Sequence, residues 1–145
     1  MKQMDIKVKY FTDKAKMPTQ SHPGDAGWDL FSAEDATINP GETVKIHTGI
    51  GISLPEGTFG GIYARSGLST KCGLRPANCV GVCDSQYVGE YIVPLHNDSR
   101  ETQEIHSGDR IAQLIVQPYV KCKFDLVDDF EETERGADGF GSSGV

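Results

Sequence analysis

The chain has 145 residues, of which 37% are hydrophobic and 24% charged, and its formal net charge is −7. This length and composition predict one globular domain that can bury a hydrophobic core. The acidic balance argues against a broad nucleic-acid-binding face, which needs clustered lysine and arginine. An anionic substrate is compatible with it, because a few placed cations, backbone N–H groups or a metal ion can bind one.

No apolar run reaches the length of a membrane span, and the N-terminus lacks the apolar segment of a signal peptide. We therefore expect a cytoplasmic protein, or one of another intracellular compartment, that does not bind membranes. The cysteines form no CxxC pair and complete no zinc template with the four scattered histidines. They predict free, partly buried thiols at Cys72, Cys79, Cys83 and Cys122.

The first half of the chain predicts short strands separated by turns. Residues 6–10 alternate apolar and polar, and strand-like runs follow at 43–47, 50–54 and 58–64. Turn signals about 8–12 residues apart are typical of a sandwich or barrel. The sequence therefore predicts an all-β fold.

Two segments of this first half carry polar groups. Asp25 and Asp29 would lie on the same side of an extended segment, where they could bind a cation through waters or act as solvated loop caps. Within residues 65–73, Leu68 and Cys72 at positions i and i+4 predict a single short helix that has Ser66 near its N-terminus and is closed by Gly73. Its start, Arg65–Gly67, offers a guanidinium, a hydroxyl and a glycine amide, which suit either a phosphate cradle or a simple N-cap.

The stretch 81–91 predicts two strands joined by a tight turn at Asp84 and Ser85. It brings a carboxylate, the Tyr87 ring and bare main chain together within a few residues. Taken alone, it is more typical of an ordinary surface hairpin. Pro94 in the strand that follows predicts an edge position or a bulge.

The end of the chain changes in composition. An apolar strand at 110–116 is interrupted by Gln113, which is either a satisfied core amide or one that faces a ligand. A last short strand is expected at 122–127. We therefore divide the chain into a β domain at residues 1–127 and, at 128–145, an acidic spacer with a mobile glycine-rich C-terminal arm.

Five segments, in this order, resemble the five motifs of the all-β, homotrimeric dUTPases, and the resemblance covers essentially the whole chain. The segments are residues 25–30, 64–68, 81–90, 108–114 and 135–144. The chain departs from the common pattern where Gln86 replaces an acidic residue, Val88 an arginine, Cys83 an aliphatic residue and Trp28 a tyrosine or phenylalanine.

The resemblance implies a jelly-roll-like β-clip barrel with one short helix, assembled as a homotrimer with active sites at subunit boundaries. It implies Mg²⁺-dependent hydrolysis of dUTP to dUMP and pyrophosphate, which limits uracil incorporation into DNA and supplies dUMP for thymidylate synthesis. Asp84 would be the general base, and Asp29 would hold metal-bound water. The implied phosphate contacts are Arg65, Ser66, Gly67 and Gln113.

The resemblance also assigns the nucleoside contacts. Tyr87 would pack on the deoxyribose and exclude a 2′-hydroxyl, while Asn78 and the main chain through Gly81 would read the uracil edge. The arm would close over a site, in its own or a neighbouring subunit. Its contact residues would be Arg135, Phe140, Gly141, Ser142 and Ser143.

Two other functions remain open at this stage. A dCTP deaminase shares the fold but needs an additional glutamate at the base amine, and Glu90 lies far along its strand for that role. A non-catalytic protein that binds a regulatory partner would be free to lose Asp84 or the arm motif, and both are intact. A second, protein-binding role stays compatible with the sequence.

Overall fold

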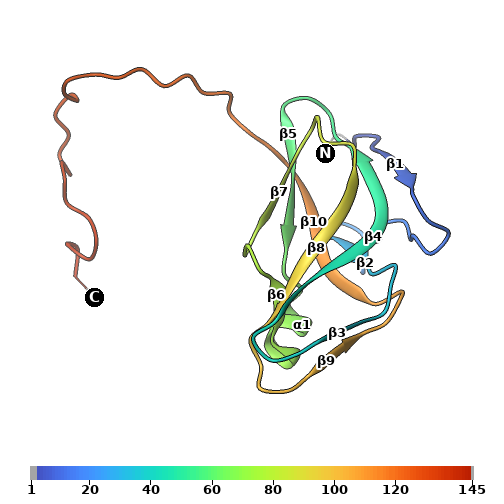
Figure 1. Cartoon of the computed structure of the whole chain (residues 1–145). Helices are drawn as coiled ribbons and strands as arrows, with labels where there is room; N and C mark the ends of the chain where they lie inside the picture. The colour runs from blue at the N-terminus through green and yellow to red at the C-terminus, as the bar shows by residue number, and fades with distance from the viewer. Residues whose placement is uncertain (1–2, 145) are drawn as a thin grey trace.

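Two antiparallel sheets of short apolar strands pack against one another to form the body of the molecule (Figure 1). The computed structural model describes residues 3–144. The first sheet has the strand order β1-β4-β8-β6 and consists of β1 (Lys7–Tyr10), β4 (Thr43–Ser53), β8 (Glu90–Asn97) and β6 (Leu74–Pro76). The second has the order β2-β10-β5-β7 and consists of β2 (Trp28–Phe31), β10 (Arg110–Pro118), β5 (Thr58–Tyr63) and β7 (Gly81–Asp84).

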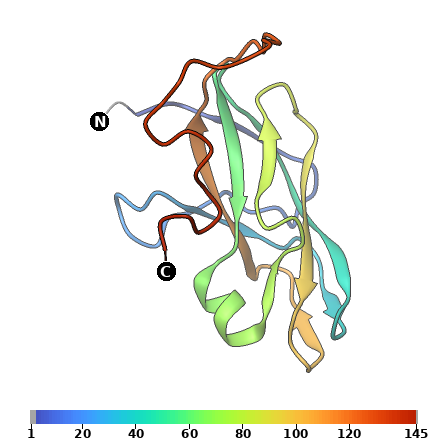
Figure 2. The same ribbon diagram turned by 90° about the vertical axis from the view of Figure 1, so that its left-hand side faces the viewer.

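A small third sheet and one helix complete the body. β3 (Ala36–Ile38) pairs with β9 (Gln103–Ile105), and α1 (Ser66–Cys72) follows β5. Figures 1 and 2 both place α1 at the same end of the molecule as β3 and β9. Gly73 ends the helix in the left-handed conformation with φ 69°, as its position after the helical period predicts.

The core lies between the two large sheets because each contributes an apolar face. In β8, Tyr91, Val93 and Leu95 are buried, whereas Ile92 between them is exposed. Each fully buried aliphatic side chain stabilises the fold by about 1.5–3 kcal/mol. The largest buried apolar side chains include Leu30, Ile38, Ile46, Ile50, Ile52, Leu74, Leu95 and Ile111.

The all-β prediction is confirmed, and most predicted strands are present. The runs at 43–47 and 50–54 are one continuous strand, β4, which passes through Gly49 at a φ of 72°. The sequence did not predict β3, β6 or β9, because strands of three residues carry too little alternation to be recognised.

The predicted hairpin at 81–91 is wrong in its pairing. β7 pairs with β5 in the second sheet, whereas β8 pairs with β4 and β6 in the first. The chain therefore crosses between the sheets after Asp84, and the turn at Ser85 and Gln86 joins two strands that are not hydrogen-bonded partners. The sequence looks like a hairpin because a crossover of this length needs the same turn residues.

The edge position predicted from Pro94 is also wrong, since β8 has neighbours on both sides. Pro94 is tolerated because it lies just beyond the short pairing with β6, where its carbonyl accepts a hydrogen bond from the Ala77 N–H at 2.7 Å. The irregular register of β8 with β4 falls elsewhere, between His47 and Gly51.

The strand predicted at 122–127 is absent, and regular structure ends at Pro118. Tyr119 makes the last backbone hydrogen bond to the body, to the Gly57 carbonyl, and the chain then runs away from it (Figure 1). Phe124 and Leu126 are fully exposed, so their apolar pattern has no sheet to pack on in this chain. Residues 1, 2 and 145, the last belonging to the predicted arm, lie outside the described residues. Within residues 3–144, no helix is long and apolar enough to span a membrane.

Candidate active site

A first hollow opens where β7 and β8 diverge into different sheets, and we call it the crossover hollow. It contains the predicted residues Asn78, Gly81, Asp84 and Tyr87, together with the unpredicted Glu90. Its remaining lining residues are Ile62, Pro76, Val82, Cys83, Tyr91, Ile92, Val93 and Pro94. An apolar hollow with two carboxylates and one amide fits a flat, polar-edged ring such as a nucleobase.

The two tyrosines of the crossover hollow hold one another. The Tyr87 hydroxyl donates a hydrogen bond to the Glu90 carbonyl at 2.6 Å, and its ring stacks on Tyr91 with centroids 6.2 Å apart. Tyr91 is 2% exposed, whereas Tyr87 is 47% exposed and presents its free face to solvent. Tyr87 is therefore a supported ring with one face available for a ligand.

The floor of this hollow is uncharged at neutral pH. Burial raises the pKa of Tyr91, with the nearby Cys83 thiol adding to the effect, and burial likewise raises the pKa of Cys83. The buried Tyr91 hydroxyl has no hydrogen-bond partner among residues 3–144. Cys83 thus acts as a small apolar group beneath the site, as the usual aliphatic residue would.

A second hollow lies beside the start of α1, and we call it the helix hollow. Its predicted residues are Asp25, Asp29, Arg65, Ser66, Gly67 and Gln113, and Ser21, Ala26, Gly27 and Ile115 also line it. Arg65 Nε donates a hydrogen bond to Asp29 Oδ1 at 2.9 Å. The buried Asp29 Oδ2 has no hydrogen-bond partner among the described residues, although Arg110 Nε forms an ion pair with it at 3.5 Å.

Gln113 is placed in the helix hollow by close contact with main chain. Its Nε2 donates to the Ala64 carbonyl at 2.8 Å, and its Oε1 lies so close to Gly27 that a methyl group there would overlap it. Gln113 is thus a satisfied amide that also lines a hollow, which combines both interpretations of the sequence. Around Gly67 the chain leaves open space, because a methyl group at that position would meet nothing within 4 Å.

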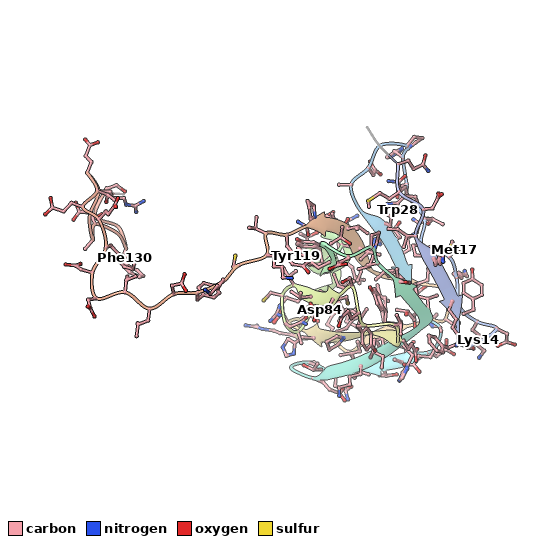
Figure 3. All side chains as sticks on the ribbon, turned by 90° about the horizontal axis from the view of Figure 1, so that it is seen from above. Lys14, Met17, Trp28, Asp84, Tyr119 and Phe130 are labelled. Atoms are coloured by element: carbon pink, nitrogen blue, oxygen red, sulfur yellow. The ribbon has the colours of Figure 1, made fainter. Side chains whose placement is uncertain are left out.

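The two hollows share no lining residue, and the arm reaches neither. Figure 3 shows Asp84 within the body, Tyr119 where the chain leaves it, and Phe130 far outside. Hydrogen bonds from residues 133–144 stay within that segment, such as Arg135 Nε to the Asp138 carbonyl at 2.7 Å. The structure thus separates the predicted residues into three groups, the last being Arg135, Phe140, Gly141, Ser142 and Ser143.

The sequence analysis did not include Glu90 in the site, and it rejected Glu90 as a deaminase glutamate because of its distance along the strand. It lines the crossover hollow with Asp84, but its carboxylate accepts from the Gly49 N–H at 3.0 Å and contacts His47 Nδ1 at 3.0 Å. Glu90 is therefore occupied by β4, which removes it as the additional glutamate of a deaminase. The alternation in β8, with Glu90 and Ile92 on the face opposite Tyr91, is the signal that could have found it.

Comparison with known proteins gives consistent matches. The dUTPase family model matches residues 13–144. The deoxyuridine 5'-triphosphate nucleotidohydrolase of Nocardia farcinica is 50% identical over 129 residues, covering 88% of this chain and 78% of the relative. The dUTPase of Staphylococcus bacteriophage 80alpha, solved with dUPNHPP, has a TM-score of 0.92 at 33% identity, covering 99% of this chain and 100% of that one.

A further structure concerns a metal ion. A mutant dUTPase from phage phi11 of S. aureus has a TM-score of 0.83 at 28% identity, covering 89% of this chain and 100% of that one. Its structure is described as revealing the coordination of a structural Mg(II) ion.

The fold, the separate carboxylate and arginine hollows, and these matches define an all-β nucleotide hydrolase. The chain belongs to the dUTPase family, and its reaction is the hydrolysis of dUTP.

Proposed function

We propose that Asp84 activates the water that attacks the α-phosphorus of dUTP, in a site built from two subunits of a homotrimer. The observation that carries this proposal is the separation of the two hollows. Asp84 lines one with Asn78 and Tyr87, whereas Arg65 and Gln113 line the other. In this proposal the crossover hollow of one chain faces the helix hollow of another, so that one nucleotide contacts both sets of groups.

The crossover hollow takes the deoxyuridine in this proposal. Asn78 and the main chain near Gly81 read the uracil edge, and the two lie together, since a methyl group at Gly81 would be 3.6 Å from Asn78 Nδ2. Tyr87 packs on the deoxyribose with its solvent-facing side, and a 2′-hydroxyl would collide with the ring. The stacking on Tyr91 and the hydrogen bond to the Glu90 carbonyl hold the Tyr87 ring in place, so it does not move aside for a 2′-hydroxyl.

The helix hollow takes the triphosphate. The guanidinium of Arg65 keeps its Nη groups for phosphate oxygens, because only Nε is bonded to Asp29. Ser66 offers a hydroxyl, Gly67 an unobstructed amide and Gln113 a side-chain amide. These are neutral or singly charged donors, so a chain of net charge −7 can bind a polyanion at this one place.

The residues of the helix hollow also fit Mg²⁺. Residues 3–144 contain no group of three metal-ligating side chains, so the ion would arrive with the triphosphate. The carboxylates of Asp29 and Asp25 are the groups that would hold its waters. Asp29 Oδ2 has no hydrogen-bond partner among residues 3–144, although it lies 3.5 Å from Arg110 Nε. When bound, the ion spreads the negative charge that develops on the phosphates.

Asp84 supplies the base. It ends β7 beside the hollow and is exposed, so a water can lie between its carboxylate and the α-phosphorus. The water oxygen bonds to the α-phosphorus, the bond from that phosphorus to the bridging oxygen breaks, and pyrophosphate leaves while Asp84 takes the proton. The arm at 128–145 closes the site, with Phe140 over the uracil ring and Arg135 at the γ-phosphate.

The direct test is the variant Asp84→Asn. Because an amide cannot take the proton, we expect turnover to fall about 10²–10⁴-fold while dUPNHPP still binds. The control is Asp5→Asn, which removes the same charge from an exposed residue outside both hollows. Near-normal pyrophosphate release by correctly folded Asp84→Asn protein would refute the mechanism.

The Asp84→Asn variant also tests whether each site is shared between two chains. Mixing Asp84→Asn chains with Arg65→Met chains should restore activity, because some mixed sites combine an intact Asp84 from one chain with an intact Arg65 from another. Absence of rescue, with mixed trimers shown to form, would place both hollows of each site on one chain.

A further inference from the structure

The wall of the crossover hollow that holds Asn78 is a short connection with little support of its own. Residues 77–80, the wall segment, lead from β6 in one sheet to β7 in the other. β6 has three residues and pairs on one side only. Within the wall segment, Cys79 has a φ of 63°, a conformation that residues other than glycine adopt infrequently.

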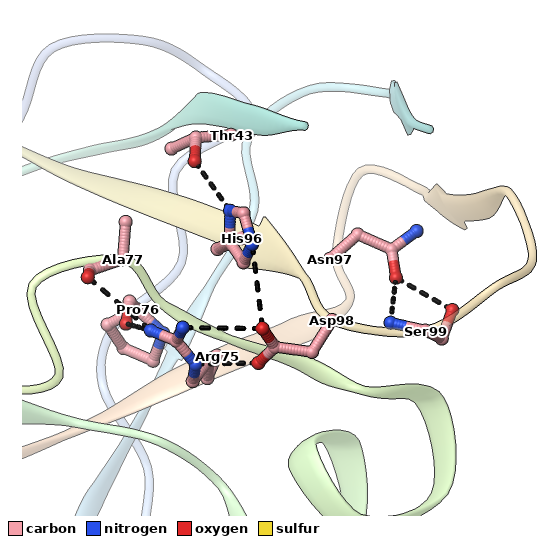
Figure 4. A network of polar contacts seen from close by, with 8 residues as sticks. All are labelled: Thr43, Arg75, Pro76, Ala77, His96, Asn97, Asp98 and Ser99. Atoms are coloured by element: carbon pink, nitrogen blue, oxygen red, sulfur yellow. Dashed lines mark hydrogen bonds and ion pairs between the residues drawn. The ribbon is translucent and has the colours of Figure 1, made fainter. Parts of the chain in front are cut away.

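Arg75 connects this wall to Asp98, the residue that follows the end of β8 (Figure 4). Its guanidinium grips Asp98 with two bonds, Nε to Oδ2 at 2.6 Å and Nη2 to Oδ1 at 3.3 Å. Its Nη1 donates to the Pro76 carbonyl at 3.1 Å and to the Ala77 carbonyl at 3.4 Å. One planar fork thus fixes the two carbonyls that immediately precede Asn78.

Asp98 is in turn held by its surroundings. Its N–H donates to the Gly73 carbonyl at 2.8 Å, and Oδ1 lies 3.5 Å from His96 Nε2. The other ring nitrogen of His96, Nδ1, is 2.8 Å from the Thr43 hydroxyl on β4. Figure 4 shows this line of contacts from β4 through β8 to the wall segment. Arg75 therefore transmits the position of the central strands to the wall.

We propose that the Arg75–Asp98 pair is a positioning device that sets the base selectivity of the dUTP site. This inference rests on the proposed function, in which Asn78 and its neighbouring main chain read the uracil edge. Arg75 itself lines neither hollow, so it acts only through the wall segment. Uracil and cytosine differ at one edge, and discrimination there requires donors and acceptors held to within about 0.5 Å.

The test compares substrates that differ in one place. dCTP shares the sugar and triphosphate of dUTP, whereas UTP shares its base. For Arg75→Met and Asp98→Asn, we expect the ratio of kcat/KM for dUTP over dCTP to fall about 3- to 30-fold, in the range seen for residues that act through others. The rise in KM for dUTP should account for most of the change, and the ratio for dUTP over UTP should stay constant because Tyr87 is untouched.

Matched variants make the result specific. Arg100→Met removes the same charge from an exposed arginine two residues beyond Asp98, for which the described residues show no side-chain bond, and it should change neither ratio. Arg75→Lys keeps the charge but loses the fork, so it should resemble Arg75→Met. A Lys variant with normal selectivity would show that charge alone matters and would overturn the proposal.

Two further outcomes would also overturn it. One is an unchanged dUTP-over-dCTP ratio in folded Arg75→Met or Asp98→Asn protein, either variant being decisive if the other does not fold. The other is an equal loss of base and sugar selectivity, which would mean general loosening. Failure of the proposed function looks different, because then Asp84→Asn would retain turnover while the Arg75 variants could still alter selectivity.

Discussion

Arg65 Nε donates a hydrogen bond to Asp29 Oδ1 at 2.9 Å, so a carboxylate of β2 orients the guanidinium at the start of α1. Asp29 is 8% exposed, and Arg110 approaches its other oxygen. In a sequence, Asp29 reads only as a possible ligand of a cation. In the fold it has two tasks, since Oδ1 orients Arg65 while the buried Oδ2 forms an ion pair with Arg110.

The variant Asp29→Asn should weaken both tasks. Losing a charge-assisted bond to Arg65 costs about 1–3 kcal/mol, which we expect to appear as weaker triphosphate binding and some loss of thermal stability. The measurement is the KM for dUTP at several Mg²⁺ concentrations, beside the same measurement for Asp25→Asn, which keeps the arginine pair. If Asp29→Asn raises KM no more than Asp25→Asn does, then orientation of Arg65 contributes nothing to binding.

Two variants of Tyr87 distinguish the contribution of its ring from that of its hydroxyl. Tyr87→Ala removes the ring, so UTP turnover should rise relative to dUTP turnover. Tyr87→Phe keeps the ring but loses the bond to the Glu90 carbonyl, worth about 0.5–1.5 kcal/mol, so its selectivity should be intermediate. Competition assays with the two nucleotides give the ratio. An unchanged ratio in the alanine variant would mean that the sugar is read by another group.

The arm tests the closing step. Deleting residues 135–145 should leave thermal unfolding unchanged, because hydrogen bonds of the segment from residue 133 stay within it, yet lower turnover about 10²-fold by loss of substrate alignment. Mixing truncated chains with Asp84→Asn chains should restore activity if an arm covers the Asp84 of another chain. No rescue in proven mixed trimers would mean that each arm closes over the Asp84 of its own chain.

His47 predicts a pH-dependent contribution to stability. The hydrogen bond that protonated His47 Nδ1 donates to the Glu90 carboxylate, with the charges of Glu90 and Glu34, raises the pKa of His47 above the ordinary 6.5, and burial opposes the shift. Protonated His47 therefore stabilises the fold fully below pH 6.5, and this contribution is lost as the pH rises through the raised pKa. Because the ring is half-exposed, the effect is small. The difference in Tm between wild type and His47→Gln should shrink from pH 5.5 to pH 9.

The large strands could be predicted because they bury enough alternating side chains to leave a pattern. The alternation in β8 and the apolar run of β10 survive from sequence to fold. The pairing of β7 could not be predicted, because a turn at Ser85 looks the same whether the next strand returns to β7 or joins another sheet. Tertiary packing alone decides between those outcomes.

In the candidate site, too, local features could be predicted from the sequence and long-range contacts could not. Its residue types could be read from the chain, since Asp84, Tyr87 and Arg65 carry side chains that suit nucleotide chemistry. The side-chain pairs that support the site could not be predicted. The two pairs, Arg75 with Asp98 and His47 with Glu90, are each separated by more than twenty positions in sequence and meet only through β8. Long-range pairs of this kind leave no local signal in a single sequence.

In the proposed trimer each site combines hollows of two chains, so the rate per chain should depend on the protein concentration. A lone chain carries the general base in one hollow and the phosphate donors in another, so it has no complete site. Once the protein is diluted well below the concentration at which trimers dissociate, mass action makes the assembled fraction fall with the square of the concentration. Specific activity should follow that curve, and saturating dUTP should shift it to lower concentration, because the substrate bridges the chains.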